Sequence, residues 1–144
     1  MTKIQFFKNI ARSDVLQYGG KGASLGEMFN TSIPVPNGFV VGSSIFQEAL
    51  KKDGLLSWIE TQLETLDIQD VSKLNNLSNK IQDKIIDLKL DESFVEQITN
   101  YFEKLDCSFV AVRSSATAED GAEDAWAGQL STFLNVKKEN LLDS

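Results

Sequence analysis

The sequence has 144 residues and contains no histidine. This excludes, within the chain, a Ser-His-Asp triad, a Cys-His dyad, a histidine-ligated zinc and a phosphohistidine. Cys107 is the single cysteine, so an internal disulfide or a cysteine-rich metal site is excluded as well. We expect it to be a buried structural thiol. Any chemistry must therefore use lysine, arginine, carboxylates, hydroxyls or backbone amides, or residues outside the chain.

The sequence also has few basic residues and no long apolar run. Lysine and arginine number 14 against 21 acidic residues, a net charge of −7, which argues against a partner that is a nucleic acid or an anionic membrane. The longest apolar stretches are far too short to span a membrane. The first residues lack the apolar core and cleavage site of a signal peptide, so we expect a cytoplasmic protein.

Hydrophobic periodicity predicts helices separated by a few short strands. Spacings of three and four residues predict amphipathic helices over residues 74–88 and after Asp91, and two more helices over 44–52 and 55–66. Apolar runs predict strands over residues 39–41, 109–112 and 132–136, the second buried on both faces and paired with the third. The length suits one domain, residues 1–144.

A glycine cluster with a lysine, Gly19-Gly20-Lys21-Gly22, precedes a further helical pattern. Backbone N–H groups of glycines, the helix N-terminus and a lysine together suit a phosphate. A simple turn at the entry to the helix fits the same residues. The Walker A spacing and the dinucleotide fingerprint both fail here, because the glycines fall at the wrong distances.

Arg113 ends an apolar strand and is followed by the hydroxyls of Ser114, Ser115 and Thr117. A guanidinium on a rigid strand is suited to a phosphate or a carboxylate, although a surface ion pair fits equally well. Four carboxylates follow within six residues, at Glu119, Asp120, Glu123 and Asp124. They could attract Mg²⁺ or form a solvated acidic loop.

Three segments in the same order resemble a known family. Residues 18–28 (YGGKGASLGEM) and 35–39 (VPNGF) are similar to the opening motifs of the nucleotide-binding domain of the phosphoenolpyruvate synthase and pyruvate phosphate dikinase family. Residues 111–120 (AVRSSATAED), 127–129 (AGQ) and 132–136 (TFLNV) resemble its second block. The middle of the chain, about residues 50–105, shows no such motif.

The resemblance implies an α+β fold, the first lobe of an ATP-grasp fold, with helices packed on a small, mostly antiparallel sheet. It implies that Lys21 and Arg113 contact the phosphates of ATP and carry the catalytic role. It also implies that Gly128, Thr132 and Phe133 line the ATP site. Lysine and arginine suit this task because phosphoryl transfer relies on positioning and on neutralising charge.

The family also needs parts that this sequence does not contain. Its Mg²⁺ ligands lie in a second lobe, so we expect no metal ligand in this chain, and its phosphoryl-carrying histidine lies on a downstream domain. We therefore expect residues 1–144 to be a piece of a longer multidomain enzyme and to be inactive alone. Ser115 favours the phosphoenolpyruvate synthase and rifampicin phosphotransferase branches over the dikinase branch. The alternatives to a phosphoenolpyruvate synthase are the rifampicin phosphotransferase branch, the pyruvate phosphate dikinase branch, and a module that binds nucleotide or protein without catalysis.

Overall fold

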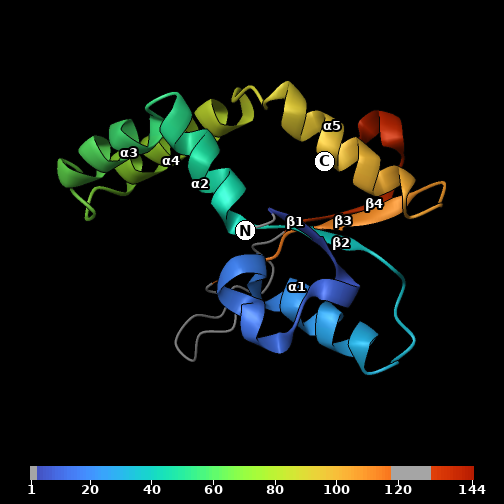
Figure 1. Ribbon diagram of the computed structural model, residues 1–144. Coiled ribbons are helices and arrows are strands. Elements are labelled where there is room, and N and C mark those ends of the chain that lie inside the picture. Colours follow the sequence, from blue (N-terminus) through green and yellow to red (C-terminus); the bar gives the residue numbers. More distant parts are fainter. Residues whose placement is uncertain (1–2, 118–130) are drawn as a thin grey trace. The chain divides into compact units, whose positions relative to one another are not determined.

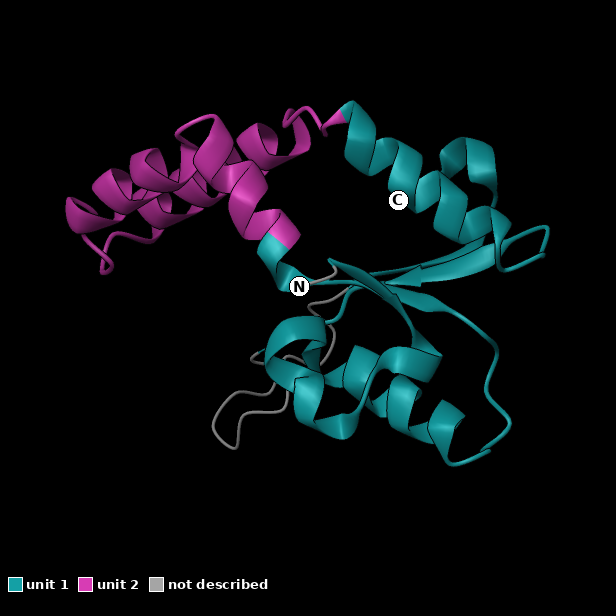
Figure 2. Ribbon diagram, in the orientation of Figure 1, with its two compact units in different colours: residues 1–44, 92–144 teal, residues 45–91 magenta. Residues whose placement is uncertain are grey.

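The computed structural model describes residues 3–117 and 131–144, and its elements confirm an α+β class (Figure 1). The chain forms two compact units: residues 1–44 with 92–144, and residues 45–91 (Figure 2). The boundary at residue 44 falls within helix α2, Ser43–Lys52. That residues 1–144 form a single domain stays a prediction.

The first unit combines two small sheets with two long helices. Its strands are β1 (Ile4–Phe6), β2 (Phe39–Val41), β3 (Val110–Arg113) and β4 (Thr132–Val136). Its α-helices are α1 (Val15–Asn30) and α5 (Glu92–Glu103), and short 3₁₀ turns cover Phe7–Asn9, Arg12–Asp14 and Lys138–Asn140. β1 pairs with β2 and β3 with β4, both antiparallel. The predicted strands 39–41 and 132–136 are confirmed at the same bounds.

The β1–β2 sheet is covered by α1 on one face and by α5 on the other (Figures 1 and 2). Phe6 pairs with Phe39 in the ladder, and both rings contact Tyr101 of α5, with centroids 4.7 and 5.4 Å away. The Tyr101 hydroxyl donates a hydrogen bond of 2.9 Å to the Ile4 carbonyl. Val40 points to the opposite face, as side-chain alternation requires, and packs against Gly22 of α1.

α1 packs closely because glycines face its neighbours. Tyr18 joins Phe7 and Ile10 in the main hydrophobic core, with Leu25 and Phe29 packed against it. A Cβ at Gly26 would lie 2.6 Å from the carbonyl oxygen of Ile10, a residue with only 1% of its surface exposed. The helix can therefore approach the segment before it only where a side chain is missing.

The β3–β4 ladder is less buried than the sequence predicted. Its pairing is confirmed, with Arg113 opposite Thr132 and Val112 opposite Phe133 and an irregularity between Val110 and Val112. However, β3 alternates between half-buried and exposed residues, whereas burial on both faces was predicted. Phe109 is 57% exposed and Cys107 is also exposed, so the prediction of a buried thiol was wrong. An apolar run resembles a buried strand whether or not a second layer covers it.

The second unit is helical. It contains most of α2, then α3 (Leu55–Glu64) and α4 (Val71–Ile86), close to the predicted ranges. Leu50, Leu55 and Leu77 are its buried apolar residues among those described. Asp70 caps α4 by accepting a hydrogen bond from the Lys73 backbone N–H, and this bond lowers the pKa of the Asp70 carboxyl.

No helix within residues 3–117 and 131–144 is long and apolar enough to cross a membrane.

We predict that Gly26→Ala destabilises the chain by about 1–3 kcal/mol. The added methyl group would overlap the Ile10 backbone, and this exceeds the gain in helix propensity. Chemical denaturation followed by circular dichroism measures the effect. Leu16→Ala, at a side chain on the same helix that is 80% exposed, should change the free energy of unfolding by less than about 0.5 kcal/mol. Equal effects of the two substitutions would contradict the packing described here.

We further predict that stability falls as the pH rises past about 10 and that Tyr18 contributes to this fall. Burial, with a smaller effect of the Asp14 charge, raises the pKa of the Tyr18 hydroxyl. The unfolded tyrosine therefore loses its proton at a lower pH than the folded one, and alkali favours unfolding. Denaturation midpoints between pH 8 and 11 should show a shallower slope in Tyr18→Phe than in the wild type. An unchanged slope would contradict this origin.

Candidate functional site

Arg113 lies exposed at the end of β3, beside two of the other predicted site residues. Its ladder partner is Thr132, and Phe133 pairs with Val112 one step further along. The Phe133 side chain is 46% exposed. The sheet thus brings Arg113, Thr132 and Phe133 together at one end of the ladder, whereas Gly128 lies outside the described residues.

The glycine cluster lies inside α1 and not before it. Residues 15–30 run as one helix interrupted at Gly19, where φ is 72° and ψ is 167°. This is a kink that only glycine adopts without strain. The predicted loop that feeds a helix is therefore one sharp turn between two helical stretches, and it places the half-buried Lys21 at the start of the second.

Hydrogen bonds tie this turn to the segment after β3. The Ser115 hydroxyl donates to the Tyr18 carbonyl at 2.8 Å and accepts from the Gly22 backbone N–H at 3.0 Å. The Gly20 N–H donates to the Ala116 carbonyl at 3.2 Å. We call Tyr18–Gly22 with Ser115 and Ala116 the serine clasp. It brings Lys21 and Arg113, far apart in sequence, to the same part of the first unit.

The serine clasp bears on whether the glycines form a phosphate cradle or a simple turn, the two alternatives that the sequence left open. The N–H groups of Gly20 and Gly22 already have protein acceptors, so they do not form an open cradle for a phosphate. The glycines serve close packing: a Cβ at Gly19 would lie 2.4 Å from both the carbonyl oxygen and the hydroxyl of Ser115. The Lys21 side chain is the cationic group of this turn and is suited to a phosphate.

The described residues suit an anion better than a cation. One lysine and one arginine project from two segments that hydrogen bonds hold together, and this donor set fits a polyphosphate such as that of ATP. Within residues 3–117 and 131–144, no group of three cysteine or acidic side chains is placed to hold a metal ion. The acidic cluster Glu119, Asp120, Glu123 and Asp124 lies outside that part of the chain.

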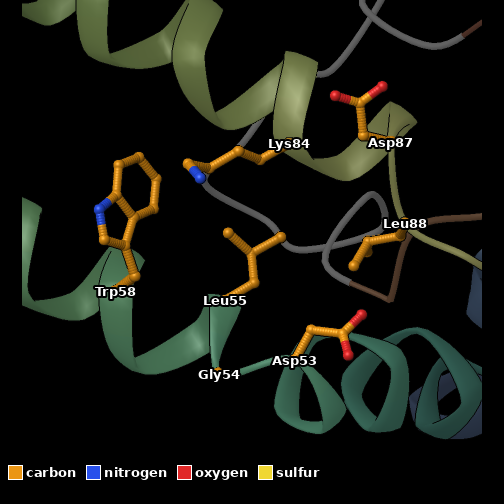
Figure 3. A pocket seen from close by; sticks show the side chains of 7 residues that line it. All are labelled: Asp53, Gly54, Leu55, Trp58, Lys84, Asp87 and Leu88. Carbon is orange, nitrogen blue, oxygen red and sulfur yellow. The ribbon is translucent and has the colours of Figure 1, made fainter.

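An open hollow of about 420 Å³ lies in the second unit and has a different character (Figure 3). Lys84 extends over the ring of Trp58, 4.8 Å from its centroid, and Asp53 and Asp87 stand at the rim. The Lys84 ammonium is thus engaged by an aromatic face. None of the predicted nucleotide-site residues lines this hollow.

The sequence did not predict the role of Ser115. In the sequence Ser115 is one of three neighbouring hydroxyl residues, and its two hydrogen bonds reach residues 93 and 97 positions away. Spacing along the chain carries no signal for such a distant contact. The one hint in the sequence is the pair of adjacent glycines. Because glycine has no side chain, another segment can approach the backbone at Gly19 closely.

Comparisons with known proteins relate the chain to one family. A family model described as pyruvate phosphate dikinase, AMP/ATP-binding domain, matches residues 15–144. A probable phosphoenolpyruvate synthase of Methanothermobacter thermautotrophicus is 39% identical over 147 residues, covering 97% of this chain and 22% of the relative. One from Methanocaldococcus jannaschii is 41% identical over 143 residues, covering 95% of this chain and 12% of the relative.

A rifampicin phosphotransferase of Bacillus cereus is also similar, with 37% identity over 139 residues that cover 94% of this chain and 16% of that protein. The chain therefore spans less than a quarter of the length of each of these three curated relatives. The matched residues include the kinked helix α1, Arg113 and the whole of β4. On this match over most of its length, the chain belongs to the AMP/ATP-binding domain family of pyruvate phosphate dikinase.

Proposed function

We propose that this chain is the ATP-binding lobe of an ATP-dependent phosphotransferase of the phosphoenolpyruvate synthase type. One observation carries the proposal: the serine clasp and the β3–β4 ladder collect Lys21, Arg113, Thr132 and Phe133 from opposite ends of the sequence. The family match supports ATP as the ligand.

Each of these residues has a definite task in the proposal. Lys21 and Arg113 hold the phosphates of ATP and neutralise their charge, which is most of what phosphoryl transfer asks of a protein. Thr132 and the half-exposed Phe133 line the site beside Arg113. Gly128, which the resemblance assigns to the same site, lies outside the described residues. ATP supplies the phosphoryl group when it is bound.

The remaining parts of the reaction belong to the rest of the protein. We propose that Mg²⁺ ligands, a second ATP-grasp lobe and a domain with a phosphorylated histidine are supplied outside residues 1–144. The absence of histidine from the chain supports the last point, because this lobe has no such acceptor of its own. A cytoplasmic location stays a prediction.

A second acceptor is favoured by one comparison. The relative from Bacillus cereus is named a rifampicin phosphotransferase, and its identity of 37% is close to that of the probable phosphoenolpyruvate synthases. Pyruvate and rifampicin are therefore the two acceptors to compare. The residues of the proposed site would handle ATP in the same way in both reactions.

We predict that Mg-ATP shifts the backbone amide resonances of two segments of this chain, residues 19–24 and 110–117, together with those of β4. These segments surround Lys21 and Arg113, and charge placed between them changes their local fields. A two-dimensional NMR titration measures the shifts. Amides of α4, in the other unit, serve as the control and should not move. Shifts centred on α4 would place the nucleotide elsewhere.

We also predict that Lys21→Ala and Arg113→Ala in the full-length protein each slow ATP-dependent phosphorylation of the acceptor about a hundredfold or more. Each substitution removes a positive charge that stabilises the phosphates of ATP. Both variants should keep the wild-type circular dichroism spectrum, because neither side chain is fully buried. Phosphorylated pyruvate or rifampicin is quantified with labelled ATP.

Lys104→Ala is the matched control, since it removes an exposed cation just after α5, which lies over the ring of Tyr101. It should retain the wild-type rate. Wild-type rates in Lys21→Ala and Arg113→Ala would overturn the site assignment. Binding of ATP without transfer to either acceptor by the wild type would favour a non-catalytic module.

A further inference from the structure

Ser115 is the one side chain among the described residues that bonds to both flanks of the lysine-bearing turn. Its hydroxyl donates to the Tyr18 carbonyl and accepts from the Gly22 N–H, so both functions of the group are used. The residue is half-buried, and Tyr18 and Gly22 are buried. A hydroxyl engaged in this way serves as a structural tether.

The contact between Ser115 and the turn is unusually close. The carbonyl oxygen and the hydroxyl of Ser115 lie 2.4 Å from where a Cβ at residue 19 would stand, so the contact requires a residue without a side chain. The positive φ of Gly19 favours glycine at this position as well. The Gly20 N–H adds a bond of 3.2 Å to the Ala116 carbonyl. Three hydrogen bonds and a steric fit thus fix one edge of the turn.

Lys21 stands between the two amides that the clasp holds. Its neighbours Gly20 and Gly22 donate to Ala116 and Ser115, so the main chain at Lys21 is restrained on both sides. Arg113 precedes Ser115 by two residues and is itself held by its ladder with Thr132. Hydrogen bonds that involve the backbone therefore join the two segments that carry Lys21 and Arg113.

Such bracing matters for a long, flexible cation. Lysine loses considerable rotamer freedom when it binds a ligand, and any additional freedom of its backbone would have to be lost as well. A restrained backbone lowers that cost, and it holds the main chain of Lys21 in place relative to the end of β3. The restraint strengthens binding only if Lys21 contacts the ligand.

We propose that Ser115 is a positioning residue of the nucleotide site, which acts through Lys21 by locking the Gly19–Gly22 turn against the end of β3. The proposal rests on the proposed function, since it assumes that Lys21 binds the phosphates. Ser115 does not touch the nucleotide in this proposal. Its hydroxyl proton is already given to the Tyr18 carbonyl.

A double-substitution cycle in the full-length protein tests the proposal. Isothermal titration with β,γ-imido-ATP, which is not hydrolysed, gives the dissociation constants of the wild type, Ser115→Ala, Lys21→Ala and the double variant. Ser115→Ala should weaken binding about fivefold to tenfold, the range expected for losing one hydrogen-bonded restraint. In the Lys21→Ala background the same change should weaken binding less than about twofold.

Asn30→Ala is the control for a purely structural effect. The Asn30 side chain ties the other end of α1 to the preceding segment, through a bond of 2.9 Å to the Ile10 carbonyl. Its loss should lower the melting temperature and leave nucleotide affinity unchanged wherever the protein is folded. Should Ser115→Ala fail to fold, Ser115→Cys takes its place, since a thiol has a similar shape and bonds more weakly.

The results separate two kinds of failure. Wild-type affinity in Ser115→Ala, or an equal loss with and without Lys21, would overturn the positioning role and leave the proposed function intact. Absence of nucleotide binding by the wild type would overturn both. A loss confined to proteins that retain Lys21 supports the role of Ser115.

Discussion

The close contact between Gly19 and Ser115 is the constraint on which the arrangement of the first unit depends. Helix α1 and strand β3 come from opposite ends of this chain, and in the described residues their direct connection runs through the serine clasp. Without a glycine at the kink, the Ser115 backbone could not lie where it does. The proposed phosphate site is a consequence of this contact, because its two cations stand on the two segments that the clasp joins.

Local rules accounted for most elements of the fold. Helical patterns located α2 to α5, and short apolar runs located β2, β3 and β4, since these signals depend on neighbours in the sequence. The same rules failed for burial at Cys107 and Phe109, both exposed in the structure. An apolar side chain favours burial, but the local sequence does not show whether another segment packs over it.

The site was predictable in part and for a similar reason. Lys21 and Arg113 stood out because cations beside glycines or at a strand end are chemically distinctive, and the motifs resembled a nucleotide-binding family. The distribution of hydrogen bonds was not predictable. The glycine amides at 20 and 22 suggested a phosphate cradle, yet they bind Ala116 and Ser115. A ligand and an acceptor elsewhere in the protein can compete for the same N–H group. The tertiary structure decides which of them binds it, and the local sequence does not show this.

The length of the loop that the clasp closes has a consequence for how the protein folds. The bond between Gly22 and Ser115 joins residues 93 positions apart, and the helices of the second unit lie within that interval. Closing so long a loop costs chain entropy before any contact repays it, whereas helix pairs of nearby residues form early. We therefore expect the helical segment to gain structure first and the two cations to meet last. The site would then exist only in molecules that have completed folding.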